Sequence, residues 1–365
     1  MKTAKPFRAL ITDSNYKHAI ALTRYLKREL PEVYTIGHVE NHTNLGGWYS
    51  CYDEIVRGPS LAESLHTCEF DMVIPVGGKS VLQVAQTCAE KSLLPSQSSL
   101  AISYDKAATV EMAVRAGVPT PKTRLIRSVA ELNVEEFTLP CVVKPAHEAV
   151  AKMVGYCRTT AEVQSTVQQQ LQALQADGIG VLVQEYIPGR GYGFFALMNE
   201  GTPVRIFMHQ RIREFPVSGG ASTAARAFYS PRLRELGLKL LTELCWTGVA
   251  MVEFKLDSRS GDFALMEING KFWGSLELAL RAGVNFGADI VRLFRGERLV
   301  YSDSYDRNLH FYWPLDNDLL TLWKMHSLGQ ALRDYWQPHA ATNCGQSVRA
   351  DFWKTVRLAK SLVTA

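Results

Sequence analysis

The chain has 365 residues, of which 47% are hydrophobic and 21% are charged, and its formal net charge is +4. This balance is typical of a soluble globular protein and excludes a disordered or fibrous chain. The length exceeds the roughly 250 to 300 residues at which one hydrophobic core stops growing, so we expect two or three subdomains. The small net charge does not indicate a nucleic-acid-binding surface.

Neither a membrane segment nor an export signal is predicted. The apolar run at 9–11 is shorter than the ~7 to 15 residue core of a signal peptide, and no later stretch reaches transmembrane length. The seven cysteines are scattered and odd in number, which is typical of reduced, mostly buried thiols, and the histidines contain no HExxH zinc motif. We therefore expect a cytoplasmic protein with no membrane partner and no nucleic-acid partner.

The first hundred residues alternate between strand and helix patterns. Strands are predicted at 7–12, 32–39 and 70–76, and helices at 18–30 and 81–91. Strands that alternate with helices indicate a parallel sheet covered on both faces. We therefore expect an N-terminal α/β domain at 1–103.

A helix then begins near 103, with Ser103 as its predicted N-cap and with Gly117 and Pro119 as its end. Its predicted apolar stripe consists of Ala107, Val110, Ala113 and Val114. A strand at 139–145, a helix at 160–176 and a strand at 181–189 follow and complete a small α+β subdomain at 104–187.

The next segment, 188–300, predicts an antiparallel sheet with helices on one side. Its strand candidates lie at 194–199, 204–212, 251–257 and 262–269, with a helix at 231–245. The last segment, 301–365, is rich in aromatic residues and is predicted to be helical. Its stripe of Leu319, Leu320, Trp323 and Leu328 is expected to pack on the preceding domain rather than to bind a partner or a membrane.

Two glycine-rich segments resemble nucleotide motifs but do not match them. In the segment 73–80, the first glycine of a P-loop would fall at Val73, and Pro75 would remove one N–H donor to phosphate. The segment 189–193 lacks the GxGxxG spacing of a dinucleotide site.

The hairpin at 251–269 is the most informative segment. A three-residue loop, Arg259 to Gly261, would pair Ser258 with Asp262 and place Glu253 opposite Glu267. Alternation places apolar residues on the core face, namely Val252, Phe254, Leu256, Ala264, Met266 and Ile268. Glu253, Glu267 and Asn269 then share the other face. Opposed carboxylates repel each other unless a cation lies between them, and three oxygen ligands suit Mg²⁺, although a solvated polar face remains open as an alternative.

Two lysines precede this hairpin. Lys144 ends an apolar strand, and Lys106 lies at the start of a helix. Each is suited to bind phosphate as a point charge, and helix N-terminal N–H groups would add to this attraction. Alone, either lysine is better explained as a solvated surface charge, and the signal lies in their order relative to the acidic hairpin.

Six segments in a fixed order resemble the ATP-grasp superfamily, in particular the carboxylate-amine ligases. They are DKAATVEMAVRAGVPTPKT, VVKP, VLVQEYIPG, RIREFPVSGGAS, GVAMVEFK and MEINGKFWGSLELALRAGV, and they cover roughly residues 100–295. The resemblance implies an N-terminal parallel-sheet domain, a small ATP-binding subdomain and an antiparallel-sheet catalytic subdomain. It also implies ATP and Mg²⁺, with the nucleotide between the two α+β subdomains.

Position by position, the resemblance implies three groups of site residues. They are Lys106 and Lys144 for phosphate, then Gln184, Glu185, Tyr186 and Ile187 for the adenine hinge, and Glu253, Glu267 and Asn269 for the metal. We expect Arg211 and Lys271 to hold the transferred phosphate or the substrate carboxylate, although a surface salt bridge would explain them almost as well.

The chain departs from the family at three places. The loop 146–155 has one late glycine, so Lys152 would substitute in covering the phosphate. The ribose-binding glutamate is replaced by Gly191, so no ribose contact is assigned. The arginine after the metal asparagine is Lys271, which keeps the charge but loses the bidentate geometry.

The sequence therefore predicts an ATP-dependent carboxylate-amine ligase that forms an acyl phosphate and releases ADP and phosphate. The residues 219–222 are expected to form a mobile loop over the site. The substrates would be a small carboxylate and a small amine, and a homodimer is left open. Two other functions also remain open: a nucleotide-binding regulatory protein with the same fold, and an ATP-grasp enzyme that uses bicarbonate.

Overall fold

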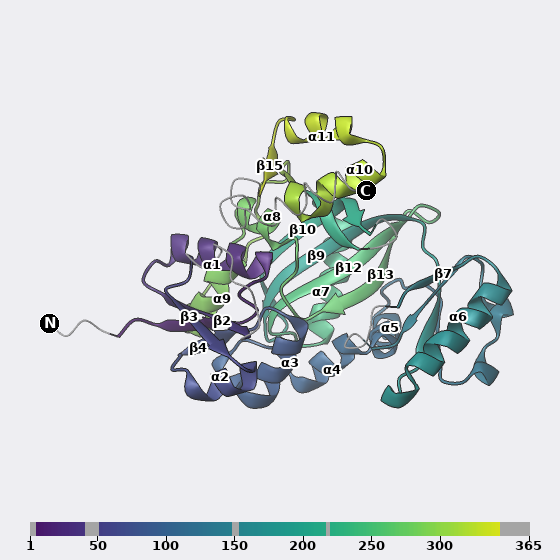
Figure 1. Cartoon of the computed structure of the whole chain (residues 1–365), viewed down its shortest axis with the longest axis horizontal. Helices are drawn as coiled ribbons and strands as arrows, with labels where there is room; N and C mark the ends of the chain where they lie inside the picture. The colour runs from purple at the N-terminus through teal and green to yellow at the C-terminus, as the bar shows by residue number, and fades with distance from the viewer. Residues whose placement is uncertain (1–4, 41–50, 148–152, 217–219, 344–365) are drawn as a thin grey trace.

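The computed structural model describes residues 5–40, 51–147, 153–216 and 220–343. Three sheets organise this part of the chain (Figure 1). A parallel sheet belongs to the N-terminal segment, a small antiparallel sheet follows, and a seven-stranded sheet lies in the middle of the molecule. The combination of α/β and α+β units predicted from the sequence is confirmed.

The N-terminal sheet has four parallel strands in the order β3-β2-β1-β4. Its elements are β1 (Arg8–Ile11), α1 (Lys17–Glu29), β2 (Tyr34–Glu40), β3 (Glu54–Gly58), α2 (Leu61–Thr67), β4 (Met72–Ile74), α3 (Gly78–Thr87), the 3₁₀ turn η2 (Ala89–Lys91) and α4 (Gln97–Tyr104). The sequence patterns did not predict β3, α2 or α4, because these elements are short and only partly apolar. β1, β4 and α1 contribute to the largest hydrophobic core, in which Leu22 and Ile74 are fully buried.

Asp105, and not the predicted Ser103, caps the next helix, α5 (Lys106–Arg115). The Asp105 side chain accepts hydrogen bonds from two backbone N–H groups of the first turn, at 2.8 and 3.0 Å. Ser103 lies instead in the last turn of α4, where its hydroxyl donates to a backbone carbonyl. An aspartate at this position satisfies the free N–H groups and complements the helix dipole.

The predicted apolar stripe of α5 is partly wrong. Val114 is 61% exposed, whereas Met112 and Ala113 are buried against the large sheet. The predicted end of the helix is correct, since Gly117 adopts a φ of +64° and its N–H donates to a carbonyl of the last turn.

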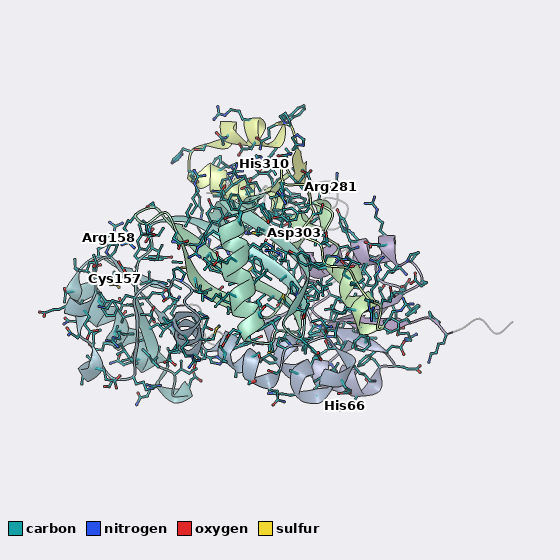
Figure 2. The ribbon with its side chains drawn as sticks, turned by 180° about the vertical axis from the view of Figure 1, so that it is seen from behind. His66, Cys157, Arg158, Arg281, Asp303 and His310 are labelled. Carbon is teal, nitrogen blue, oxygen red and sulfur yellow. The ribbon has the colours of Figure 1, made fainter. Side chains whose placement is uncertain are left out.

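The small antiparallel sheet has the order β5-β8-β6-β7. Its strands are β5 (Thr123–Ile126), β6 (Cys141–Pro145), β7 (Gly155–Cys157) and β8 (Val181–Glu185). Its helices are α6 (Thr160–Ala173) and the 3₁₀ turns η3 (Val129–Glu131), η4 (Val134–Glu136) and η5 (Gln175–Asp177). Val163 and Val167 of α6 pack on this sheet and close a separate small core. Figure 2 places Cys157 of β7 in this unit, away from His310 in the C-terminal segment.

The large sheet has the order β13-β12-β9-β10-β11-β14-β15. The first five of these strands are accompanied along the chain by helices that pack on the sheet. In chain order, these strands and helices are β9 (Gly189–Asn199), β10 (Thr202–Phe215), β11 (Ala221–Ala227), α7 (Pro231–Glu243), β12 (Gly248–Asp257), β13 (Phe263–Asn269), α8 (Leu276–Arg281) and α9 (Phe286–Phe294). α7 covers one face, as the view from behind in Figure 2 shows, and the N-terminal unit, α8 and α9 pack on part of the other face. The second face carries the charged residues described below.

The strand β11 corrects one expectation. Ala221 and Ser222 were predicted to lie in a mobile loop, but they begin β11, which pairs with β10. Gly219 lies outside the described residues. The run from Ala221 to Ala227 is built largely of alanine, with Thr223 as its one β-branched residue and no aromatic residue, so it carries little of the signal by which a strand is recognised in a sequence.

The C-terminal segment is not wholly helical, which corrects a second expectation. It consists of β14 (His310–Tyr312), a distorted turn η6 (Pro314–Asp318), α10 (Leu319–Lys324), α11 (Leu328–Tyr335) and β15 (Ala340–Thr342). β14 pairs with β11 and extends the large sheet. The predicted stripe is also shifted, because Trp323 is 37% exposed while Leu322 is buried.

Of the six cysteines in the described ranges, three are buried, two are half-buried and Cys245 is exposed, and none of the six forms a disulfide. The predicted burial of the thiols therefore holds for only three of these six. No helix within the described ranges has the length and apolar character needed to cross a membrane.

Candidate active site

The two carboxylates of the hairpin lie opposite each other, as predicted. Glu253 of β12 pairs with Glu267 of β13, and Met251 pairs with Asn269. The path to this register differs from the prediction. The backbone N–H of Asp257 donates to the carbonyl of Asp262, so the loop has four residues, and a bulge next to Glu253 restores the predicted register.

The bulge also corrects the predicted core face. Phe254 pairs with Leu265 rather than with Met266, and Leu265 is buried in the core beneath α7, whereas Met266 is partly exposed. A strict alternation of faces cannot predict this change, because a bulge inserts one residue into one strand only.

Arg211 of β10 reaches across β9 to the first carboxylate. Its Nη2 lies 2.6 Å from Oε2 of Glu253, and its Nη1 lies 3.5 Å from Oε1 of Glu214. Gly191 of β9 lies beneath these side chains, and a Cβ atom there would lie 2.9 Å from Cδ of Arg211. The glycine that departs from the family pattern therefore gives room to the arginine.

Burial raises the pKa of the Glu253 carboxyl. Arg211 opposes this shift, and the neighbouring carboxylate of Glu267 adds to it. Two carboxylates that face each other in a largely desolvated place favour the binding of a positive charge between them. This is the condition expected of a cation site.

Asn269 and Lys106 surround the second carboxylate. Nδ2 of Asn269 donates to Oε1 of Glu267 at 2.8 Å. Because the amide nitrogen of this buried side chain is used in that bond, its carbonyl oxygen is the atom that can bind a metal ion. Nζ of Lys106 lies 3.9 Å from Oε2 of Glu267. Within the described ranges, no three His, Cys, Asp or Glu side chains are arranged to hold a metal ion. A magnesium ion would therefore need phosphate or water oxygens beside these side chains, which is how this ion commonly binds.

Lys144 lies in the small sheet and contacts Gln184, one of the predicted hinge residues. Its Nζ donates to Oε1 of Gln184 at 3.0 Å, and Nε2 of Gln184 donates to Thr123 at 2.9 Å. The amide of the buried Gln184 is therefore fixed and holds the lysine at the end of β6. Lys152, the other predicted phosphate ligand, lies outside the described residues.

The other predicted hinge residues contact the hairpin of the large sheet. Glu185 forms an ion pair with Arg259 of the hairpin loop at 3.0 Å. Nζ of Lys255 donates to the carbonyl of Ile187 at 3.2 Å and lies 4.8 Å from the centre of the Tyr186 ring. The segment 185–187 is thus tied to the hairpin that carries the paired carboxylates.

Lys271 reaches towards the N-terminal unit. A Cβ atom on Gly78, at the start of α3, would lie 3.7 Å from Nζ of Lys271. Burial lowers the pKa of His18 to about 3, and the charges of Lys17 and Lys271 contribute to this shift. These contacts place Lys271 beside α3 and His18 of the N-terminal unit.

The sequence reasoning missed two residues on this face. Lys255 lies two positions after Glu253 on β12, so the alternation that selected Glu253 also selects it. Glu214 has no such signal, since it lies three positions after Arg211 and a regular strand would turn it to the opposite face.

Comparisons with known proteins support the fold. No model of a known protein family matches the chain. The chain is similar to the carbamoyl phosphate synthase large chains of Methanosarcina acetivorans and Methanosarcina barkeri, with 22% identity over 232 residues in each case. The match covers 58% of this chain and 21% of each relative, so the chain matches about a fifth of the length of these relatives.

Several solved structures are similar along most of the chain. The biotin carboxylase domain of 2-oxoglutarate carboxylase from Hydrogenobacter thermophilus has a TM-score of 0.68 at 19% identity, covering 84% of this chain and 74% of that one. Biotin carboxylase from Campylobacter jejuni has a TM-score of 0.69 at 15% identity, with the same coverage. The L-amino acid ligase from Bacillus licheniformis has a TM-score of 0.65 at 14% identity, covering 84% and 80%. The chain has the fold of the ATP-grasp superfamily.

Proposed function

We propose that the protein is an ATP-dependent ligase that activates a carboxylate as an acyl phosphate and passes the acyl group to an amine. The observation that carries this proposal is the opposed pair of Glu253 and Glu267 on one face of an ATP-grasp sheet. Arg211 lies against the first carboxylate, and Lys106 lies near the second. This alternation of negative and positive groups suits a bound polyphosphate with a divalent cation.

The residues fit a magnesium ion in their chemistry. Glu253, Glu267 and the amide oxygen of Asn269 would hold it, since oxygen ligands are those that Mg²⁺ prefers. When bound, the ion would neutralise phosphate charge and orient the nucleotide.

The lysines and the arginine would act on the phosphates. Lys144 and Lys106 would hold the nucleotide, while Arg211 would stabilise the charge on the transferred phosphoryl group. A carboxylate oxygen of the substrate would attack the γ-phosphorus, and the bond from phosphorus to ADP would break. The amine would then attack the acyl carbon and lose a proton, and inorganic phosphate would leave.

Two of the similar structures motivate the choice of an amine as the acceptor. An L-amino acid ligase and a phosphoribosylamine–glycine ligase from Thermotoga maritima are among the similar structures, the second with a TM-score of 0.66 at 14% identity. Because such low identity carries the fold alone, neither substrate pair is transferred to this chain.

Bicarbonate is a second candidate for the carboxylate. The similar structure from Hydrogenobacter thermophilus is a complex with bicarbonate, and the curated relatives are carbamoyl phosphate synthase large chains. In this case ADP would form with bicarbonate as the only added acid. A regulatory protein that binds nucleotide without turnover is the third candidate, motivated by the lysine at 271.

One screen separates these candidates. Purified protein is incubated with Mg·ATP and with bicarbonate, or with pools of amino acids and small acids with and without amines, and nucleotides are resolved by chromatography. We expect ADP and phosphate when both an acid and an amine are present. AMP and pyrophosphate would contradict the acyl-phosphate mechanism, and nucleotide binding without any turnover would favour the regulatory function.

We also propose small-molecule substrates, a cytoplasmic location and a homodimer. The structure from Hydrogenobacter thermophilus is described as a dimer, which motivates the last of these. Light scattering of the purified protein tests it, and a mass equal to that of one chain would contradict it.

A further inference from the structure

The strands β10 and β11 carry two register shifts beside Arg211. The pairs on either side of the shifts are Arg211 with Ala225, Arg213 with Ala224, and Glu214 with Ser222. Ile212 is therefore an extra residue in β10, and Thr223 is an extra residue in β11. The first shift displaces the pairing by one residue, and the second restores it.

The double shift decides which side chains face the site. In a regular strand Arg211 and Arg213 would lie on one face and Glu214 on the other. In this structure Glu214 lies beside Arg211, over Gly191. Arg213 points to the opposite face, where its guanidinium lies 5.4 Å from the centre of the Tyr312 ring.

One carboxylate of the C-terminal segment bonds to Arg213 of β10, which lies between the two shifts, and to Thr223, the extra residue of β11. Oδ1 of Asp318 accepts hydrogen bonds from Nε of Arg213 at 2.8 Å and from the hydroxyl of Thr223 at 3.0 Å. Oδ2 accepts from Nη2 of Arg213 and from the hydroxyl of Tyr335, both at 2.7 Å. Asp318 is 0% exposed, so its charge depends on these partners.

The backbone of the C-terminal segment presents Asp318 to the sheet. Asn317 adopts a φ of +80°, and the N–H groups of Asp316 and Asp318 both donate to the carbonyl of Trp313. The N–H of Trp313 in turn donates to the carbonyl of Thr223 at 2.9 Å. Figure 1 shows this segment, with α10 and α11, lying against the end of β10. The turn is thus bonded to the bulged residue through both backbone and side chain.

We propose that Asp318 is a positioning residue of the active site, which acts through Arg213 and Thr223 to turn Arg211 and Glu214 onto the face of the paired carboxylates. The proposal has a geometric part, namely that Asp318 sets the double shift, and this part rests on the observed pairing of β10 and β11. The consequence for nucleotide binding rests on the proposed function, because it assumes that Arg211 contacts the terminal phosphate. The two parts are tested separately.

The geometric test is the crystal structure of Asp318→Asn. This substitution keeps the shape of the side chain but removes one of the two carboxylate charges that pair with Arg213, the other being that of Asp334 in α11. We expect the double shift to relax and the contact of 2.6 Å between Arg211 and Glu253 to be lost. If the shifts and the contact persist unchanged, the proposal is overturned, whatever the protein binds.

The functional test compares two nucleotides by calorimetry with Mg²⁺ present: a non-hydrolysable ATP analogue with a γ-phosphate, and ADP. Asp318→Asn should weaken the binding of the analogue about tenfold or more and change the binding of ADP less than twofold. Arg211→Lys should do the same, and the double variant should bind no more weakly than the weaker single variant. Additive losses would show that Asp318 does not act through Arg211 and would refute the proposal.

Asp289→Asn is the matched control. Asp289 is 4% exposed and forms a second ion pair with β10, at 2.7 Å to Nε of Arg205, far along the strand from the double shift. A general effect of breaking a buried pair would weaken nucleotide binding in both variants, and that result would overturn the positioning role.

If Asp318→Asn does not fold, Thr223→Val takes its place in both tests, since it removes one hydrogen bond at the shift and leaves the ion pair with Arg213. If the wild type binds neither nucleotide, the proposed function fails, and the crystal structures alone decide the geometric part.

Discussion

The hairpin β12–β13 and the pair β10–β11 lie in the same sheet and differ in what determines their register. Both pairs are antiparallel, both contain bulges, and both place charged residues on the site face. In the hairpin the strands are joined by four residues, so the register is fixed locally. In β10–β11 the register is held by Asp318, more than 100 residues beyond Arg213 in the chain. The pairing of the hairpin therefore depends on residues within the hairpin itself, whereas that of β10–β11 depends on a residue far away in the chain.

The largest expected effect comes from the hairpin. We predict that Glu267→Gln lowers turnover by at least about a thousandfold, because the change is nearly isosteric but removes one charge that would hold magnesium against the phosphates. Relief of the repulsion from Glu253 should raise stability by roughly 0.2 to 1 kcal/mol, on the scale of cross-strand pairs. Turnover as a function of magnesium concentration and thermal melting measure both effects.

A solvated polar hairpin predicts a different result for the same variant. Turnover would stay within a few-fold of wild type, and the magnesium curve would not move. That outcome would remove Glu267 from the active site, and the argument from opposed carboxylates would have to be abandoned.

The second-largest expected effect comes from Gly191 of β9, the strand that lies between β12 and β10. Gly191→Ala places a Cβ atom 2.9 Å from Cδ of Arg211 and 3.2 Å from Oε1 of Glu214. The arginine must move, and because displacements of about 1 Å in a reacting geometry can cost up to 100-fold in rate, we expect turnover to fall tenfold or more. Steady-state kinetics with the substrates found in the screen measure this loss.

Gly329→Ala is the control for that substitution. Gly329 lies in α11, and a Cβ atom there meets nothing within 4 Å. An alanine should stabilise this helix by roughly 0.5 to 1 kcal/mol without changing turnover. Equal rates for Gly191→Ala and Gly329→Ala would contradict the view that Gly191 is a glycine in order to make room for Arg211.

The sequence was sufficient for elements whose pattern is local. The β-α alternation near the N-terminus, the strands from β6 onward with strong apolar runs, and the pairing of Glu253 with Glu267 were predicted correctly. It was insufficient where the deciding contact comes from elsewhere in the chain. The alanine-rich β11 is a strand because β10 and β14 flank it, and Glu214 reaches the site face only through a double shift held by Asp318.

The pH dependence of stability tests a second contact between distant parts of the chain, at a buried carboxyl group. Burial raises the pKa of Glu277 in α8 to about 7, with Arg24 and Lys17 of the N-terminal segment opposing the shift. Because this pKa lies above the unfolded value of about 4.3, the folded state binds more protons, and the group's contribution to stability is present below pH 4.3 and lost by about pH 7. Glu277→Gln removes this dependence. Relative to wild type, its free energy of unfolding should rise by on the order of 2 kcal/mol between pH 5 and pH 8. Urea unfolding at both pH values measures the difference, and parallel curves would show that the environment of Glu277 does not disfavour its charge.

The smallest expected effect comes from the loop of the hairpin and tests whether this loop sets the hairpin register. Gly261 in the hairpin loop has a φ of +72°, and a Cβ atom there would meet nothing within 4 Å, so alanine would introduce backbone strain but no steric clash. We expect Gly261→Ala to cost about 1 to 2 kcal/mol of stability, as measured by urea unfolding. Turnover should not change, because the bulge and the ladder around Glu253 fix the carboxylates independently of the loop tip.

Gly178→Ala is the matched control, with a φ of +64° and equally open surroundings in the small sheet unit. If both variants lose similar stability but only Gly261→Ala loses turnover, the loop sets the register of the paired carboxylates. The hairpin would then depend on its turn in the way that β10–β11 depends on Asp318.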